Sequence, residues 1–392
     1  MYDVIVVGAR CGGAATAMLL ARRGHRVLLV DRARFPSDMR LSTHLVWPAG
    51  VARLKRWGLL DALAATGCPP LAEAVFDVGP FALRGGFPPV EGVDVAYVPR
   101  RRVLDGLLVE AAVAAGVELW EGVTVEGLRA DDGAVTGIRA RSGGRSVTAQ
   151  AQVVIGADGM RSRVGELVDA PRYRHRPAVQ GSYWSYWSGV GSEWALYPRD
   201  GLTAYAFPTH DGLTLVGVNW SIDRWRAVRA DIAGEHFRAV AEADPALAER
   251  LAAGRREERW VGAATPGFFR KPYGPGWALV GDAGYTKDPC TAQGISDAFG
   301  QAELLAEAVH DGLAGRRPMA AALADYQSRR DTAALPMYEF TCEMARMQPP
   351  TPEKAAMLAA LSGDRAATER FFGVFAGSVS VAEFFGAATA AA

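Results

Sequence analysis

Three positions in the stretch VVGARCGGAATAML (residues 6–19) have the spacing of a glycine-rich turn that binds the phosphates of a dinucleotide. Gly8 and Gly13 occupy the first and third glycine positions of the pattern G-x-G-x-x-G, and Arg10 replaces the second. In this pattern the first glycine permits a tight turn, the second lets the backbone approach the pyrophosphate, and the third lets the helix pack on the strand. A guanidinium can donate hydrogen bonds to phosphate oxygens. Without the second glycine the backbone cannot come as close to the pyrophosphate. We therefore expect the charge of Arg10 to bind the phosphates instead.

The segments on either side of this turn are those that such a site requires. YDVIVV (2–7) is an unbroken β-branched run typical of a buried strand, small and apolar residues at helical spacing follow it, and HRVLLVD (25–31) repeats the strand pattern. Asp31 lies 23 residues after Gly8, near the spacing at which a carboxylate accepts hydrogen bonds from a ribose. The pattern predicts a βαβ unit that binds a dinucleotide. The alternative is a glycine- and alanine-rich helix start without a ligand.

Composition favours a small-molecule partner. The chain has 392 residues, 49% of them hydrophobic, and its 43 basic and 43 acidic residues cancel, which favours neither nucleic acid nor a charged membrane surface. Four cysteines without a C-x-x-C pair argue against a metal site, a disulfide framework and a redox dithiol, and fit a reducing cytoplasm. No apolar run approaches the roughly 18 to 20 residues of a membrane-spanning helix, and we expect no signal peptide before the first strand.

The remainder of the sequence predicts a nucleotide-binding domain that is interrupted by a second sheet. A helix is expected at 101–116, followed by three short strands and a final apolar strand within 117–159. Residues 172–266 hold six of the ten tryptophans, and their pattern predicts an antiparallel sheet. A buried strand (277–284) and a helix (289–312) then repeat the pattern of the nucleotide-binding domain. The expected divisions are 1–75, 99–171 and 267–317 for the nucleotide-binding domain, 76–98 for strands added to the second sheet, 172–266 for a substrate domain and 318–392 for C-terminal helices.

Three further motifs give the chain a family resemblance. VPRRRVLDGLL (98–108), VIGADGMRSRV (154–164) and ALVGDAGYTKDPCTAQGISDA (278–298) follow the glycine turn in the order found in flavoprotein monooxygenases related to para-hydroxybenzoate hydroxylase. The geranylgeranyl reductases and flavin-dependent halogenases are relatives of that family. The resemblance covers most of residues 1–310. It implies an α/β, Rossmann-like FAD domain of the glutathione-reductase type, interrupted by an antiparallel substrate sheet and followed by C-terminal helices, with FAD bound non-covalently.

The resemblance also implies roles for particular residues. Arg101 would contact the ribityl or phosphate part of the flavin, Asp158 would lie near the cofactor and the nicotinamide donor, and Asp282 would accept a hydrogen bond from a ribityl hydroxyl. A helix that opens at Pro289 would direct its free N–H groups at the flavin pyrimidine. The full set of implied cofactor-binding residues is Gly8, Arg10, Gly13, Asp31, Arg32, Arg40, Arg101, Val125, Asp158, Gly281, Asp282, Pro289, Gln293, Gly294 and Ile295. Two positions depart from the family pattern: Ala292 replaces a glycine, and Tyr285 replaces the histidine of many hydroxylases.

The segment 34–61 corresponds to the loop that runs over the flavin in the family. Arg40, Ser42 and His44 are candidates for contacts there. A histidine titrates near neutral pH, so His44 could act as a general base. The alternative is that His44 is an ordinary hydrogen-bonding loop residue.

The resemblance leaves the reaction open between two main classes. The favoured one is monooxygenation, in which NAD(P)H reduces the flavin and O2 forms a C4a-hydroperoxide that oxygenates an apolar, aromatic or polyketide-like small molecule. The alternative is hydride transfer to a prenyl alkene, as in geranylgeranyl reductases. Halogenases carry W-x-W-x-I-P, and VNWSID (218–223) keeps only Trp220 and Ile222 of it. No second glycine-rich unit or dithiol supports a disulfide reductase, and a flavin-binding protein without turnover is a further alternative.

The sequence SYWSYW (182–187) bears on the substrate. In a strand its residues alternate between two faces, so that Trp184 and Tyr186 lie on the face opposite Tyr183 and Trp187. One set is expected to line a cavity while the other packs the domain, although both sets could belong to the core.

Overall fold

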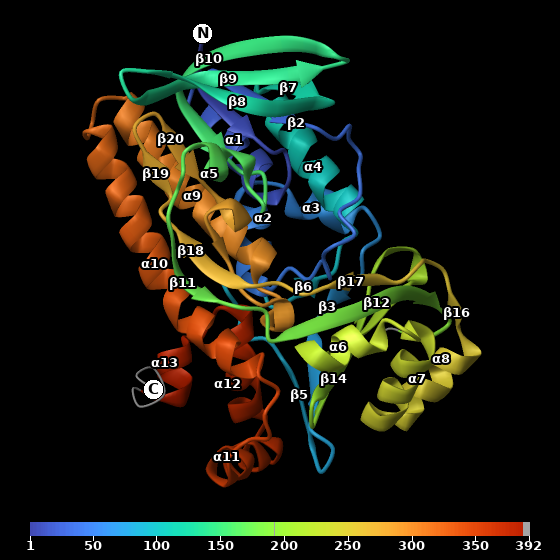
Figure 1. Ribbon diagram of the computed structural model, residues 1–392. Helices are drawn as coiled ribbons and strands as arrows, with labels where there is room; N and C mark the ends of the chain where they lie inside the picture. Colours follow the sequence, from blue (N-terminus) through green and yellow to red (C-terminus); the bar gives the residue numbers. More distant parts are fainter. Residues whose placement is uncertain (192, 387–392) are drawn as a thin grey trace.

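The structure is a computed structural model that describes residues 1–191 and 193–386. Its upper half in Figure 1 contains a parallel sheet with the order β20-β10-β1-β2-β7, to which β19 adds an antiparallel edge. The strands are β1 (Tyr2–Val7), β2 (Val27–Asp31), β7 (Glu118–Glu121), β10 (Arg145–Gly156), β19 (Tyr273–Gly274) and β20 (Trp277–Leu279). The neighbours of β1 therefore come from distant parts of the chain, and the α/β fold predicted from the sequence is confirmed.

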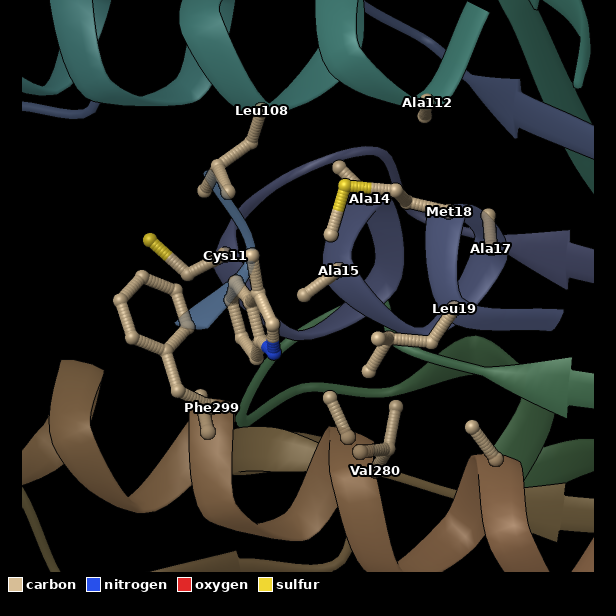
Figure 2. Close-up of a cluster of buried hydrophobic side chains, with 14 of the residues drawn as sticks. Cys11, Ala14, Ala15, Ala17, Met18, Leu19, Leu108, Ala112, Val280 and Phe299 are labelled. Atoms are coloured by element: carbon tan, nitrogen blue, oxygen red, sulfur yellow. The ribbon is translucent and has the colours of Figure 1, made fainter. Parts of the chain in front are cut away.

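Three helices cover one face of this sheet. Helix α1 (Cys11–Ala21) lies between α4 (Arg101–Ala114) and α9 (Gly294–Leu313), and Figure 2 shows Leu108 reaching it from one side and Phe299 from the other. Small residues such as Ala14 and Ala17 are fully buried on α1. Because these side chains are short, the neighbouring helices approach closely and hold the start of α1 at the end of the sheet.

An antiparallel meander covers the other face, and it differs from the expectation for residues 117–159. It consists of β8 (Val123–Asp131), β9 (Ala134–Ser142) and the first half of β10, and α5 (Arg163–Leu167) follows it. The expected third and final strands are one continuous strand, β10. Its first half alternates between exposed and buried residues and pairs with β9, while its second half is buried on both faces and pairs with β1. A change of burial pattern within one strand was misread as a break.

The second sheet has the order β16-β12-β15-β14-β13-β4-β5, with β17 on the free part of β12. Its strands are β4 (Glu73–Asp77), β5 (Ala82–Gly86), β12 (Gln180–Ser188), β13 (Ala195–Arg199), β14 (Leu202–Pro208), β15 (Thr214–Ser221), β16 (Arg255–Arg256) and β17 (Val261–Ala263). Helices α6 (Ile222–Val228), α7 (Ile232–Ala243) and α8 (Pro245–Ala253) follow β15 in the chain. Tyr183 and Trp187 share a buried cluster with residues of these helices, while Trp184 and Tyr186 belong to the cluster on the opposite face. The predicted alternation of SYWSYW is confirmed.

The C-terminal helices connect the two sheets. Helix α10 (Met319–Met344) packs along α9, and α11 (Pro352–Ser362) and α12 (Arg365–Ala376) lie beside β5 of the second sheet in the lower part of Figure 1. Helix α13 (Val381–Phe385) packs against α10 and α12. The smaller elements are α2 (Pro48–Arg56), α3 (Leu60–Ala64), β3 (Pro70–Leu71), β6 (Ala96–Tyr97), β11 (Arg172–Arg176), β18 (Gly267–Arg270), β21 (Tyr285–Thr286) and the 3-10 turns His210–Gly212, Gly281–Ala283 and Pro289–Thr291. Among the described residues no helix is long and apolar enough to cross a membrane.

The start of α9 also differs from the expectation. The helix was predicted to begin at Pro289, but residues Pro289–Thr291 form a separate 3-10 turn and α9 begins at Gly294. Ala292 between them adopts a left-handed conformation (φ 52°) that interrupts the helical path. This conformation favours glycine, which is the residue that Ala292 replaces relative to the family pattern.

Candidate active site

The glycine turn joins β1 to α1 as predicted. Gly8 has a positive φ of 103°, and a Cβ there would lie 2.4 Å from the carbonyl oxygen of Ala157. A Cβ on Gly13 would lie 1.7 Å from the carbonyl oxygen of Gly8, so only glycine lets α1 pack this closely on the end of β1. Arg10 has an extended backbone (φ −100°) that any residue adopts, which is why this position tolerates a side chain.

Arg10 and Arg101 meet at one carboxylate. Arg10 Nη1 lies 2.6 Å from Asp105 Oδ2, and Arg101 donates to Asp105 Oδ1 through Nε (3.1 Å) and Nη2 (3.0 Å). Arg10 Nη2 also donates to Ser37 Oγ at 3.0 Å. Asp105 is fully buried, and a carboxylate there is compatible with folding because two guanidinium groups pair with it. The structure thus brings together two residues that the sequence placed in separate motifs.

Asp31 ends β2 beside the same turn. Its Oδ2 accepts a hydrogen bond from the Ala9 N–H and its Oδ1 from the Ala33 N–H, both at 2.7 Å. These bonds hold the carboxylate next to the turn and leave further lone pairs for a ligand hydroxyl. Arg32, the next residue, is exposed and has no partner among the described residues.

Asp282 lies in the 3-10 turn that follows β20. Its side chain is exposed to open space and makes no hydrogen bond within the described part of the chain. Burial nevertheless raises its pKa to about 6, with the positive charge of Arg101 acting in the opposite direction. The turn packs on α9, and a carboxylate that is accessible and yet desolvated indicates a recessed position. Gly294 at the start of α9 also faces open space, because a Cβ there would meet nothing within 4 Å.

The first turn of α9 offers free backbone N–H groups near Asp282. Because Gly294, Ile295 and Ser296 form the first turn, their N–H groups lack intrahelical acceptors. The side chain of Gln293 turns elsewhere, since its Nε2 donates to the Phe375 carbonyl at 2.9 Å. Gly281 is fixed by a hydrogen bond from its N–H to Gln301 Oε1. Pro289 is exposed at the beginning of its 3-10 turn.

Two of the predicted cofactor residues, Asp158 and Val125, interact with other parts of the protein. Asp158 accepts from Ser162 Oγ at 2.5 Å and from the Val164 N–H at 3.0 Å, so it closes the turn before α5. Val125 is buried in β8 opposite Ala140. Contacts of either residue with a cofactor remain predictions. Tyr285, at the family's histidine position, packs in a cluster with Phe269 and Tyr338.

The loop between β2 and α2 places its three candidates differently. Arg40 is exposed and has no partner among the described residues, whereas His44 is buried in a left-handed conformation (φ 67°). Its Nε2 is hydrogen-bonded to the Tyr186 hydroxyl, and its Nδ1 has no partner in the described residues. Burial and the nearby Arg101 hold the pKa of His44 well below its usual 6.5, so the ring is uncharged at neutral pH. Ser42 Oγ accepts from the His44 N–H at 3.1 Å.

A cavity of about 80 Å³ lies between the second sheet and the turn Pro289–Thr291. Leu41, Ser42 and Thr43 border it on one side, and Leu41 is 63% exposed at its edge. The remaining lining residues are Trp47, Ser182, Trp184, Trp194, Leu196, Tyr205, Phe207, Asn219, Ala263, Thr265, Pro289, Cys290, Thr291, Ala292 and Phe375. The turn before α9, where the flavin ring is expected, is therefore one wall of an aromatic cavity.

A larger hollow of about 1190 Å³ runs along α9 between α2 and α10. Of the predicted cofactor residues it includes only Gln293, and several of its charged side chains already pair with one another. Arg53 and Arg56 both bind Glu303, and Arg329 binds Glu307. Of the predicted residues, only Ser42 and Pro289 border the smaller cavity, and we place the chemistry there because its wall joins the loop before α2 to the turn before α9.

Sequence reasoning missed several residues of this site. Asp105 gave a usable signal, since it is an acidic residue beside Leu104 and Leu108 on the buried face of a helix. Tyr186 was placed on the correct face, but its hydrogen bond to His44 joins positions 142 residues apart and has no local signal. Phe375 reaches the cavity from α12, far beyond the region of family resemblance.

The residues present fit FAD. Gly8 and Gly13 have no room for a Cβ, Asp31 ends β2, and Asp282 is a carboxylate without a partner in the described residues, in a turn that packs on α9. These are the groups that a pyrophosphate, a ribose and a ribityl chain require. When bound, FAD supplies reversible hydride and electron transfer to the site.

Comparisons with known proteins agree with this geometry. The FAD binding domain family matches residues 1–238. A digeranylgeranylglycerophospholipid reductase of Methanocella arvoryzae is 26% identical, covering 83% of this chain and 82% of its own. The 6-methylpretetramide 4-monooxygenase of Streptomyces rimosus is 27% identical, covering 80% and 76%.

A solved structure supports the fold along nearly the whole chain. The myxobacterial chondrochloren halogenase CndH superposes with a TM-score of 0.81 and 24% identity, covering 98% of this chain and 94% of that one. At this identity the likeness concerns the fold alone. The family match and the fit of the site confirm the predicted FAD cofactor. The chain belongs to the FAD binding domain family and is an FAD-dependent oxidoreductase.

Proposed function

We propose that this protein is a monooxygenase that uses NAD(P)H and O2 to hydroxylate an apolar, aromatic or polyketide-like small molecule. The observation that carries the proposal is the cavity beside the turn Pro289–Thr291, with Trp184, Trp194 and Phe207 in its wall. Trp194 and Phe207 stack with ring centroids 5.4 Å apart and nearly parallel planes. Such a wall suits a flat ring placed against the flavin.

The comparisons support this class without deciding the substrate. The Streptomyces rimosus relative is by name a monooxygenase, and the Methanocella arvoryzae relative is by name a reductase, at nearly equal identity. The cavity favours the first class, because its wall of aromatic rings suits a flat ring. The larger parts of a polycyclic substrate would extend past the exposed Leu41.

The halogenase motif receives no support from the cavity. Trp220, which the sequence shares with the motif W-x-W-x-I-P, is fully buried in the cluster beneath α7 and α8. It therefore lies on the face of the second sheet that points away from Trp184 and the cavity.

His44 is the proposed base. Its neighbours Leu41–Thr43 border the cavity, burial keeps its ring uncharged at neutral pH, and its Nδ1 has no partner in the described residues and is the nitrogen that would take the proton. Tyr186 holds Nε2, and Arg100 stacks on the Tyr186 ring at 4.1 Å from its centroid. His44→Gln should lower kcat and change its pH profile, whereas a purely structural role would change stability and leave the shape of the profile intact.

The reaction is tested by oxygen dependence. With NAD(P)H and an accepted aromatic substrate, a monooxygenase consumes one O2 for each hydroxylated product, and poor substrates cause release of hydrogen peroxide. A reductase forms its saturated product under strict anaerobiosis, and O2 only competes. Hydroxylated product in air and none without O2 is the expected result. Full anaerobic turnover to a saturated product would replace the proposal with the reductase alternative.

A further inference from the structure

The cavity beside the turn Pro289–Thr291 is lined without any ionised side chain. Its described lining contains no aspartate, glutamate, lysine, arginine or histidine. An anionic ligand would lose its hydration there without gaining an ion pair, and this loss exceeds what neutral hydrogen bonds return. The lining therefore selects a neutral ligand.

Three polar residues that the second sheet contributes to the lining lie together at one end. Ser182 of β12 lies directly opposite Asn219 of β15, and Thr265 follows the strand that pairs with Ser182 on its other side. Trp184 and Phe207 lie further along the same face, toward the other end of these strands. A ligand in this cavity meets aromatic rings at one end and uncharged hydrogen-bonding groups at the other.

The hydrogen bonds within the polar end show which groups are free. Ser182 Oγ donates to the Val218 carbonyl at 3.0 Å, so the Tyr205 hydroxyl is the donor in its 2.7 Å bond to Ser182. Tyr205 reaches that far because its ring crosses β15 at Gly217, where a Cβ would lie 2.3 Å from the ring. Asn219, by contrast, makes no side-chain hydrogen bond within the described residues and is half-buried on the cavity. Its amide has both a donor and an acceptor available.

We propose that Asn219 determines specificity by binding a hydroxyl or carbonyl group on one edge of a neutral, flat aromatic ligand, while the ring body contacts Trp184 and Trp194. This inference rests on the proposed function, since it names the chemistry of the substrate for the same cavity. It also sets an orientation, in which the polar edge of the ligand lies at Asn219 and its apolar edge at the tryptophans.

The test measures binding of three matched single-ring probes to the FAD-loaded protein. The probes are toluene, 4-methylphenol and 4-methylbenzoate, and binding is followed by perturbation of the flavin absorbance. We expect 4-methylphenol to bind about 2- to 12-fold more tightly than toluene, the range of one hydrogen bond, and 4-methylbenzoate to bind more weakly than both. In Asn219→Leu, which keeps the volume and removes the amide, the preference for 4-methylphenol over toluene should disappear.

Thr203→Val is the matched control. Thr203 pairs with Asn219 from β14 but does not line the cavity, so this variant should keep the wild-type preference. If Asn219→Leu fails to load FAD, Asn219→Ala takes its place. Tight binding of 4-methylbenzoate would overturn the selection for neutral ligands, and an unchanged preference in the Asn219 variant would overturn its role. These are equilibrium measurements, so anaerobic reductive turnover would refute the proposed reaction while leaving the binding result intact.

Discussion

The guanidinium of Arg10 lies 2.6 Å from the carboxylate of Asp105, a fully buried residue 95 positions further along the chain. Arg101 binds the same carboxylate from one helical turn earlier. The glycine turn and the start of α4 are thereby joined by one shared negative charge. Two arginines with one carboxylate leave a net positive charge at the place where a pyrophosphate is expected.

We expect Asp105→Ala to destabilise the apoprotein by about 3 to 5 kcal/mol, because it leaves two largely buried guanidinium groups without their partner. Urea unfolding measures the change. Arg10→Gly is the control, since Asp105 keeps Arg101 and the glycine restores the usual turn residue. A loss in Arg10→Gly equal to that in Asp105→Ala would show that Arg101 does not compensate the carboxylate.

Asp282→Ala should weaken FAD binding far more than Arg10→Gly. It removes a carboxylate acceptor that has no partner in the described residues, and a hydrogen bond to a charged group contributes about 1.5 to 3 kcal/mol. This corresponds to an increase in Kd of roughly 10- to 150-fold, measured by titrating the apoprotein with FAD. Equal losses in the two variants would assign the ribityl contact to another residue.

The affinity for FAD should fall as the pH drops below about 6. Burial raises the pKa of Asp282 to about 6, so the group is a carboxylate above this pH and a weaker acceptor, the neutral acid, below it. The stability of the apoprotein changes in the opposite direction. The carboxyl proton of Asp282 is bound more tightly in the folded state than in the unfolded chain. The contribution of Asp282 to the free energy of unfolding therefore decreases as the pH rises from about 4 to 6. Asp282→Asn should flatten both profiles, and a wild-type profile in this variant would contradict the assignment.

His236 should make the protein sensitive to acid. This side chain is fully buried in α7 beside Trp260, and burial lowers its pKa to about 3. Between pH 6.5 and 3 His236 is protonated in the unfolded chain but stays neutral in the folded state. The free energy of unfolding therefore falls by about 1.4 kcal/mol for each unit that the pH falls. The unfolding free energy of wild type, taken relative to that of His236→Leu, should fall at this slope as the pH decreases. A constant difference would show that the ring protonates in the folded state.

Acid denaturation should release unmodified FAD. No histidine or cysteine of the sequence lies in a recognisable motif for covalent flavin attachment. Cys11, beside the glycine turn, is buried, and its thiol donates a hydrogen bond to Asp105. Burial also raises the pKa of this thiol, so it remains unreactive. Mass spectrometry of the denatured protein checks the result, and a mass increase on the polypeptide would reveal a covalent bond.

Local patterns were sufficient for the elements that hold the cofactor. The strand before Gly8, the helix after it and Asp31 at the end of β2 depend on residue types and short spacings, and such signals survive in a single sequence. The start of α9 was misplaced because proline usually marks the first turn of a helix, whereas here Ala292 adopts a left-handed conformation that separates Pro289 from the helix.

The contacts between distant segments could not be predicted in the same way. The bond between His44 and Tyr186 depends on how the second sheet lies against the loop after β2, and no periodicity encodes that arrangement. The role of Asn219 could not be predicted either. Its neighbours Ser182 and Tyr205 are hydrogen-bonded to each other, whereas the Asn219 side chain has no hydrogen bond within the described residues.

The order of strands in the parallel sheet has a consequence during synthesis. At roughly 5 to 20 residues per second, about 15 to 60 seconds separate the emergence of β1 from that of α9, the helix that covers one side of α1. Until then the nascent chain cannot complete the layer shown in Figure 2, and the apolar surface of α1 toward Phe299 stays open. A fragment ending near residue 238 would remain in this state permanently, because it lacks both β20 and α9. The ribosome-bound protein is therefore a candidate client for chaperones until its last quarter has been made.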